Sequence, residues 1–304
     1  MYLSEDLITS VKRRANIPTS QVTFQNTDFL ALADEEIRSK MIPLILRHME
    51  EFYVYHLDQL VINGQENYAI PSRAVAMTLR DVQMIDETDS DTRVGLERLN
   101  PEDMYTGVAG NARFLVKKTG FYLENNTLFV YPMPVSSGAI LRMSFYMRPN
   151  QLIPTANCGF ITSINSALNQ FTVSALPSTI TVNTLVDFVK ANPGFECMTY
   201  DEAISGISGN TVTMVNALPL NLSLGDYVCP ATQSCVVQVP VEFQPLLFQY
   251  VVIRVLSAQG DQANLKAAVA ELADLEKSAG TLIAPRVSGK VKRVTNSRNI
   301  SRWV

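Results

Sequence analysis

The feature that most restricts the fold of this chain is a repeated β pattern that lies between two stretches of helical pattern. Residues 161–177 read ITSINSALNQFTVSALP, and residues 204–219 read ISGISGNTVTMVNALP. Both copies place two isoleucines three residues apart, then polar turn residues, then alternating threonine and valine, and both end in Ala-Leu-Pro. Neither copy can bury its apolar face alone, so the pair predicts a small β-barrel or sandwich with internal pseudo-symmetry.

The repeat belongs to residues 155–240, a segment whose composition differs from that of the rest of the chain. It contains one lysine, Lys190, and no arginine, and it is rich in Ser, Thr, Asn and Val. Helical pattern resumes directly after it. We therefore predict that this β segment is inserted into a partly helical protein.

A short amphipathic helix is predicted near the start of the sequence. Ser4 followed by Glu5 and Asp6 is a helix-start signal, and Ile17-Pro18 would end the helix.

A longer helix is predicted from residue 28 to residue 55, opened by Asn26-Thr27-Asp28. Its apolar stripe at helical spacing consists of Leu30, Ile37, Met41, Ile45, His48 and Phe52. Pro43 lies inside the pattern, where it removes one backbone hydrogen bond and crowds the carbonyl four residues back. We therefore expect a kink, or two helices, around Lys40.

Two more helices are predicted after the insertion. Residues 246–258 are apolar on nearly all sides, which is typical of a helix buried against several neighbours. A second helix follows Gly260-Asp261, with Gly280 as its stop after Ala279. Its apolar face would consist of Leu265, Val269, Leu272 and Leu275. We expect an antiparallel helical hairpin that packs against the N-terminal helices.

Strands are predicted between the two helical parts, starting at Val61. Residues 68–86 alternate in polarity, and residues 121–149 give the clearest sheet signal. In the latter stretch, Asn125-Asn126 and residues 135–138 are turn sequences, so we expect an antiparallel three-stranded meander.

These patterns predict an α+β protein: a helical bundle with a small antiparallel β meander, an inserted β-barrel or sandwich domain, and an extended C-terminal arm. The expected divisions are 1–154 and 241–284 for the core, 155–240 for the insertion and 285–304 for the arm.

The arm is strongly basic although the protein is acidic. It contains six cations, no carboxylate side chain and the only tryptophan: Arg286, Lys290, Lys292, Arg293, Arg298, Arg302 and Trp303. The whole chain has 25 Lys and Arg against 29 Asp and Glu, so without these six cations the rest carries a formal charge of −10. Such a run is either a solvated terminus or an arm that docks on a negatively charged or strand-accepting partner. A general DNA-binding protein is disfavoured, because the acidic body would repel DNA.

Few residues suggest catalysis or metal binding. His48 and His56, the only histidines, are eight residues apart, which does not match a zinc-binding His pair on one helix. Residues 86–92, DETDSDT, lack the glycine and closing glutamate of a calcium loop. Ser208 lies in GISGN without nucleophile-elbow spacing, and no nucleotide-binding glycine motif occurs. We therefore expect no enzyme activity, no cofactor and no metal.

The cysteines and apolar runs predict a reduced protein without a membrane anchor. No two of Cys158, Cys197, Cys229 and Cys235 form a C-x-x-C pair, so we expect free, partly buried thiols. Residues 246–256 are interrupted by Arg254 and are too short to span a bilayer. The acidic start of the sequence is unlike a signal peptide.

Together these pieces resemble one family, the head-to-tail adaptor (head completion or neck) proteins of tailed bacteriophages. The resemblance rests on the helical pattern of 28–54, on YAIPSRAVAMTLRDV with its P-x-R and L-R-x-V elements, on the proline-containing β stretch 121–153, and on the late apolar helix.

This resemblance implies a ring of subunits, commonly twelve, beneath the portal protein. The ring would connect the capsid to tail or nozzle proteins in the virion neck, after synthesis in the cytoplasm of the bacterial host. DNA would pass through without sequence-specific binding, and the basic segment would be an arm that docks on the portal. The insertion exceeds what a minimal adaptor needs, so it would face outward toward tail fibres or capsid.

Two alternatives stay open. One is a fibre-attachment or receptor-attachment protein that uses the inserted β domain. The other is a virion hydrolase that depends on His48 or His56.

Overall fold

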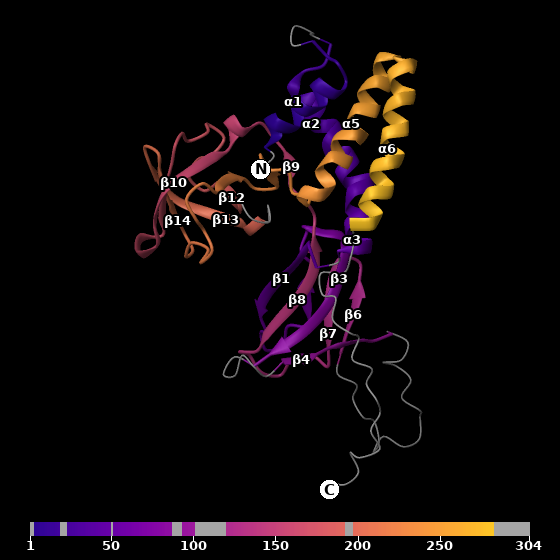
Figure 1. The fold of residues 1–304 in the computed structure, drawn as a ribbon. Helices are drawn as coiled ribbons and strands as arrows, with labels where there is room; N and C mark the ends of the chain where they lie inside the picture. Colours follow the sequence, from indigo (N-terminus) through magenta and orange to yellow (C-terminus); the bar gives the residue numbers. More distant parts are fainter. Residues whose placement is uncertain are drawn as a thin grey trace, which may run out of the picture.

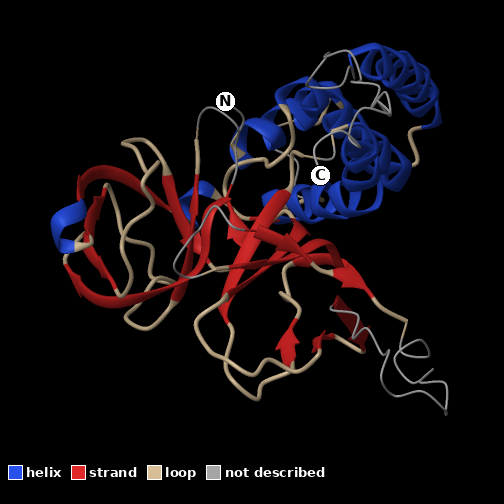
Figure 2. Ribbon diagram, turned by 90° about the horizontal axis from the view of Figure 1, so that it is seen from below, coloured by secondary structure: helices blue, strands red, loops and turns tan. Residues whose placement is uncertain are grey.

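The computed structural model describes residues 3–18, 23–49, 51–86, 93–100, 120–191 and 197–282 (Figure 1). Helices form one layer, two small sheets lie below it, and a barrel of strands lies to the side of the place where layer and sheets meet (Figures 1 and 2). The predicted α+β class is confirmed.

The helical layer combines both ends of the described chain. Its helices are α1 (Ser4–Arg14), α2 (Asn26–Glu36), α3 (Ile42–His48), α5 (Gln244–Gln259) and α6 (Gln262–Leu282). Leu7, Phe29, Ile45 and Val251, one from each of the first four, are fully buried in a single core. No helix in the described part of the chain is long and apolar enough to cross a membrane.

The first helix begins where predicted and ends early. The backbone N–H of Leu3 donates to Asp6 Oδ2 at 3.0 Å, which satisfies one of the amides at the helix start. The helix ends at Arg14, before the predicted Ile17-Pro18, because Asn16 takes a positive φ of 50° that a right-handed helix cannot contain. Ile17 then turns into the helical core.

The second helical pattern is broken around Lys40, as Pro43 predicts, but the break is a widened turn. A π-helical turn, Ile37–Met41, joins α2 to α3, and the N–H of Ile42 donates to the carbonyl of Ile37, five residues back. This wider turn gives the Pro43 ring space that an α-helical turn would deny it.

The predicted helix end at residue 55 is wrong. Helix α3 ends at His48, and Val54–Leu60 form strand β1. All seven residues of β1 pair with strand β8 (Ile140–Met147), so long-range pairing overrides the local helical spacing.

The two late helices form a hairpin with two departures from the predicted pattern. Gly260, at φ 74°, ends α5, and Asp261 Oδ1 accepts the N–H of Asn264 at the start of α6. Helix α6 continues past Gly280 to Leu282. Val269 is 49% exposed, whereas Ala268 is buried and its carbonyl accepts the side-chain amide of Gln249. A small residue is needed at this close approach, so valine faces solvent.

The region below the helices is two facing sheets, and the predicted three-stranded meander is wrong. One sheet has the order β1-β8-β3-β4 and the other β2-β7-β6-β5. The remaining strands are β2 (Asn67–Ala69), β3 (Ala74–Ile85), β4 (Arg93–Gly95), β5 (Glu97–Arg98), β6 (Gly120–Glu124) and β7 (Thr127–Tyr131).

Only the first hairpin of that meander forms. Strands β6 and β7 pair around Asn125, which takes the expected positive φ, and β2 occupies the other edge of β7. Strand β8 crosses to the opposite sheet, because the link after β7 contains Pro132 and Pro134, which cannot donate to a ladder. Leu128 and Phe145, one from each sheet, are fully buried in the core between them.

The inserted segment folds as six strands that pair in a closed barrel, in the order β10-β11-β14-β13-β12-β15. Their bounds are β10 (Gly159–Asn165), β11 (Gln170–Val173), β12 (Leu185–Val189), β13 (Cys197–Ser208), β14 (Thr211–Met214) and β15 (Tyr227–Pro230).

The sequence repeat corresponds to two neighbouring hairpins of this barrel. Ile161 of the first and Ile204 of the second are both fully buried. The second strands of the two hairpins, β11 and β14, pair antiparallel with Phe171 opposite Val212. Each hairpin therefore completes the apolar core of the other, as the repeat predicted.

Two glycine substitutions test the barrel packing. A Cβ at Gly159 would lie 2.8 Å from Cγ1 of both Val173 and Val228, so Gly159→Ala should lower the free energy of unfolding by about 1–3 kcal/mol. Gly206 has open space around the same position, so Gly206→Ala should stay within about 1 kcal/mol of wild type. Urea denaturation compares the two, and equal losses would contradict this account of the barrel interior.

Candidate functional site

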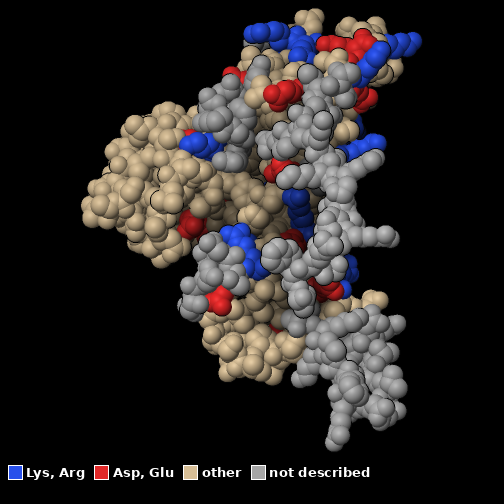
Figure 3. Space-filling view, turned by 60° about the horizontal axis from the view of Figure 1, so that its bottom comes forward, with Lys and Arg blue, Asp and Glu red and all other residues tan. Residues whose placement is uncertain are grey.

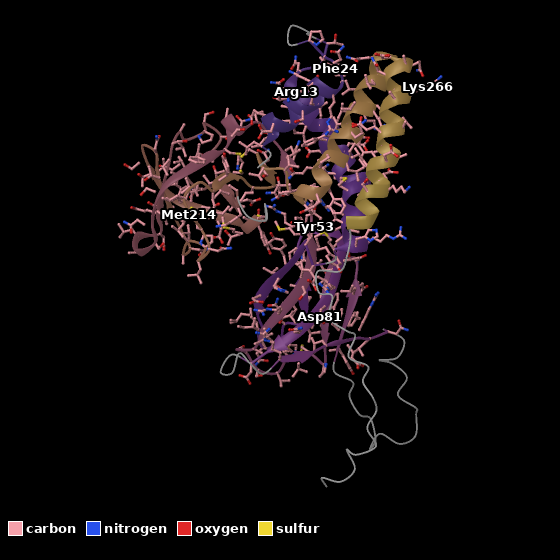
Figure 4. The ribbon with its side chains drawn as sticks, in the orientation of Figure 1. Arg13, Phe24, Tyr53, Asp81, Met214 and Lys266 are labelled. Carbon is pink, nitrogen blue, oxygen red and sulfur yellow. The ribbon has the colours of Figure 1, made fainter. Side chains whose placement is uncertain are left out.

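The helical layer and the two sheets together form the body of the subunit. The junction between this body and the barrel is the most elaborate polar site in the described part of the chain. The entering and leaving segments run side by side there, because β9 (Gln151–Leu152) pairs parallel with β16 (Gln233–Ser234). Tyr53, labelled in Figure 4 where helices and sheets meet, donates its hydroxyl to the carbonyl of Gln238 at 2.8 Å.

A buried arginine connects the body with the barrel wall. Arg73, just before β3, has a side chain only 7% exposed and forms a two-nitrogen contact with the fully buried Asp187 of β12. The Arg73 Nη2–Asp187 Oδ1 distance is 2.8 Å, and the Nη1–Oδ2 distance is 3.0 Å. The same guanidinium donates to Asp201 of β13 at 2.8 Å and to Asn150 at 2.9 Å.

The carboxylate at the centre of this network accepts donors from every side. Asp187 accepts the Asn150 side-chain amide at 2.7 Å and the backbone N–H groups of Asp201 and Thr232 at 3.0 and 3.1 Å. Burial raises the pKa of the Asp187 carboxyl, and the charge of Arg73 opposes that rise. The contact is directional and its hydrogen bonds are filled, so this network favours one orientation of the barrel relative to the sheets.

A second buried carboxylate anchors the crossing segment to the helices. Asp34 of α2 accepts the backbone N–H of Leu152 in β9 at 2.9 Å. Burial raises the pKa of Asp34 from 3.8 to about 6, while the bond from Leu152 and the charge of Arg38 act in the opposite direction. The ionised form is therefore costly in the folded protein.

The residues weighed for catalysis do not meet. His48 ends α3, whereas His56 lies on the exposed face of β1 with Nδ1 3.0 Å from Ser144 Oγ. Burial lowers the pKa of His56, and Arg142 lowers it further. Ser208 ends β13 in the barrel. The acidic run 86–92 beyond Asp86, and the whole basic arm with Arg286, Lys290, Lys292, Arg293, Arg298, Arg302 and Trp303, lie outside the described residues.

Exposed apolar side chains gather at the end of the sheets that lies away from the helices. The loops after β1 and β7 are joined there, because Asn63 N–H donates to Ser137 Oγ and Gly64 N–H to the carbonyl of Pro134. The exposed members of this apolar tip are Leu60, Ile62, Val94, Met133 and Val135. Charged side chains are frequent on the helical layer but sparse on the barrel (Figure 3). Exposed apolar side chains that lie together are typical of contact surfaces.

Sequence reasoning missed the junction network. In the sequence, Arg73 stands out only as the arginine of P-x-R, and no partner for it is indicated. One signal was available, because Asp187 interrupts the otherwise apolar run LVDFV, and a carboxylate at a buried strand position requires a partner. Nothing local identifies that partner, which lies 114 residues away.

A comparison with known families finds one match. A protein-family model described as SU10 adaptor protein matches residues 4–192, more than half of the chain. The matched range includes both sheets, the helices α1 to α3, and the barrel strands β10 to β12, and therefore both Arg73 and Asp187. No curated protein matches the chain.

Removal of Arg73 should be far more costly than removal of a partly exposed arginine with the same type of partner. Arg73→Ala leaves Asp187 buried and unpaired, so the free energy of unfolding should fall by about 3–5 kcal/mol. Arg142 pairs with the half-exposed Asp58 at 2.7 Å, and Arg142→Ala should cost at most about 1 kcal/mol. Urea denaturation of both variants measures the difference, and similar losses would show that the buried pair has no special role.

The free energy of unfolding should fall as the pH rises toward the folded-state pKa of Asp34. Because the folded-state pKa is about 6 and the ordinary value is 3.8, the folded protein gains stability from protonated Asp34 below pH 4 and loses it between pH 4 and about 6. Asp34→Asn keeps an oxygen for the Leu152 N–H and should remove this loss, which is at most about 3 kcal/mol.

Unfolding free energies at several pH values between 4 and 7 measure this slope. Asp274→Asn, on the exposed face of α6, is the control and should retain the wild-type slope. A wild-type slope in Asp34→Asn would contradict the assignment.

Proposed function

Because the chain belongs to the SU10 adaptor protein family, and is thus a structural adaptor protein of a bacteriophage, we propose that its copies form a ring below the portal. The ring joins the capsid to the tail and continues the DNA channel. The observation that carries this proposal is the family match over residues 4–192, which includes the first three helices, both sheets and half of the barrel strands.

The structure of the subunit supports a mechanical role in the virion. A ring between capsid and tail must keep its shape while DNA passes, and the Arg73–Asp187 network locks two bodies that would otherwise move on their connecting segments. We propose that residues 1–154 with 241–284 form the ring core and that 155–240 is an inserted domain. The apolar tip supplies an area that a neighbouring subunit can cover.

Charge supports the DNA-channel part of the proposal. Outside the arm the chain has an excess of carboxylates, and acidic walls do not hold a phosphate backbone. DNA then moves through the ring without sequence-specific binding.

The basic arm is proposed to bind the portal. Helix α6 ends on the side of the helical layer that faces the sheets (Figure 1), and in the sequence the arm begins three residues after its last residue, Leu282. Twenty extended residues reach about 66 Å, which is enough to leave the parent subunit. Arg286, Lys290, Lys292, Arg293, Arg298 and Arg302 supply the charge, and Trp303 is a terminal anchor.

A second role belongs to the barrel, as a contact for tail fibres or a receptor. The specific observation in its favour is a set of exposed apolar side chains on the barrel. Leu220 and Leu224 are exposed in the loop after β14, and Gly225, next to Leu224, lies close to the exposed Phe160 of β10. This role is compatible with the ring, and if the arm were dispensable it would become the principal function.

Deletion of residues 285–304 should abolish portal binding while ring formation and folding persist, because the helical core ends before the arm. Native mass measurement of the protein alone, and mixed with the portal protein, gives both results. We expect a closed ring, with twelve copies as the family resemblance implies, and a stable portal complex only for the full chain.

The matched control replaces the six arm cations by Gln at unchanged length. This change should weaken portal binding, and the difference in affinity from wild type should shrink as the salt concentration rises, because salt screens the charges of the arm. A monomer under all conditions would contradict the ring. Equal portal binding by the truncated chain would contradict the docking role of the arm and favour the barrel.

A further inference from the structure

Three of the four cysteines come together at the same junction, from positions that are far apart in the sequence. Cys158 precedes β10, Cys229 lies in β15 and Cys235 directly follows β16. All three are buried, and their Sγ atoms lie within 4.8 Å of one another. The fourth, Cys197, is buried in a different core, between barrel and sheets. The three form a defined cluster, which we call the thiol triad.

We propose that the thiol triad is a binding site for a thiophilic metal ion, Cu(I), held by three sulfur ligands. Metal–sulfur bonds of about 2.3 Å in a trigonal site place the sulfurs about 4.0 Å apart, so shifts below 1 Å complete the geometry. Thiolates are soft ligands, which favour Cu(I), Zn(II) and iron–sulfur clusters over hard cations. Among the described residues the group contains three donors, whereas a closed structural zinc site uses four.

The surroundings favour an ion that needs no water ligand. Ile153, Val189 and Val236 are buried against the triad, and Cys229 and Cys235 themselves are fully buried. Burial also raises the pKa of the Cys229 thiol, so this sulfur must give up its proton when it binds a metal ion. Binding therefore forms Cu–S bonds, breaks S–H bonds and releases up to three protons to solvent, with no change in oxidation state.

A bound ion would tie together the segments that connect barrel and body. Cys158 lies on the entering segment and Cys235 on the leaving segment. The carbonyl of Cys235 accepts the N–H of Ser4, and Leu3 bridges to Val236, so the start of α1 is attached to the same place. A bound ion would therefore cross-link the two connecting segments, in addition to the Arg73 network.

The test is a titration of the full-length, reduced protein with Cu(I) under anaerobic conditions against a chromophoric Cu(I) chelator. We expect one Cu(I) per chain, proton release, a rise in the unfolding temperature, and X-ray absorption that reports three sulfur neighbours. Cys158→Ala and Cys235→Ala should each weaken binding at least about 100-fold, the upper end of what loss of a supporting contact causes.

Cys197→Ala is the matched control, because it removes a buried cysteine outside the triad and should leave Cu(I) affinity unchanged. Equal weakening in Cys197→Ala, or undiminished binding in both triad variants, would overturn the proposal. So would wild-type X-ray absorption with fewer than three sulfurs, a measurement that does not depend on variants that fold. Binding of Zn(II) that Cu(I) does not displace would overturn the choice of metal.

Discussion

The placement of the barrel on the rest of the subunit is constrained by one buried ion pair, between Arg73 next to β3 and Asp187 of the barrel. Neither side chain would be tolerated in a dry interior alone, and each is acceptable only where the other is present. Their contact is also directional, because the planar guanidinium meets the carboxylate with two nitrogens. Apolar packing holds each body together, whereas this pair selects one arrangement between them.

Features that depend on residues close in the sequence, such as hairpins and helix interruptions, were predicted correctly. The two copies of the repeat became hairpins, because each contains its own alternation and turn residues such as Asn169 and Gly209 with positive φ. Pro43 correctly marked an interrupted helix, since a missing N–H acts within one turn. The class of the protein followed from the same patterns.

Features that depend on distant partners were not predictable from one sequence. Strand β8 continues the alternation of β7 but pairs with β1 and β3. Pro132 and Pro134 mark a break after β7, yet no local signal identifies β1 and β3 as the partners. Val269 fits the apolar spacing of α6, yet Ala268 is needed at the close approach to α5. For the same reason, Arg73 and the thiol triad could be recognised as residues but not as sites.

The parallel pairing of β9 with β16 has an evolutionary consequence. The chain leaves the body and returns to it at adjacent points. The contact between the body and these two short strands therefore does not depend on which domain is attached beyond them. A module joined through neighbouring ends can be lengthened, exchanged or deleted without a change in the path of the remaining polypeptide. The barrel therefore occupies a position at which selection can change the attached domain without a change in the helical layer or the two sheets.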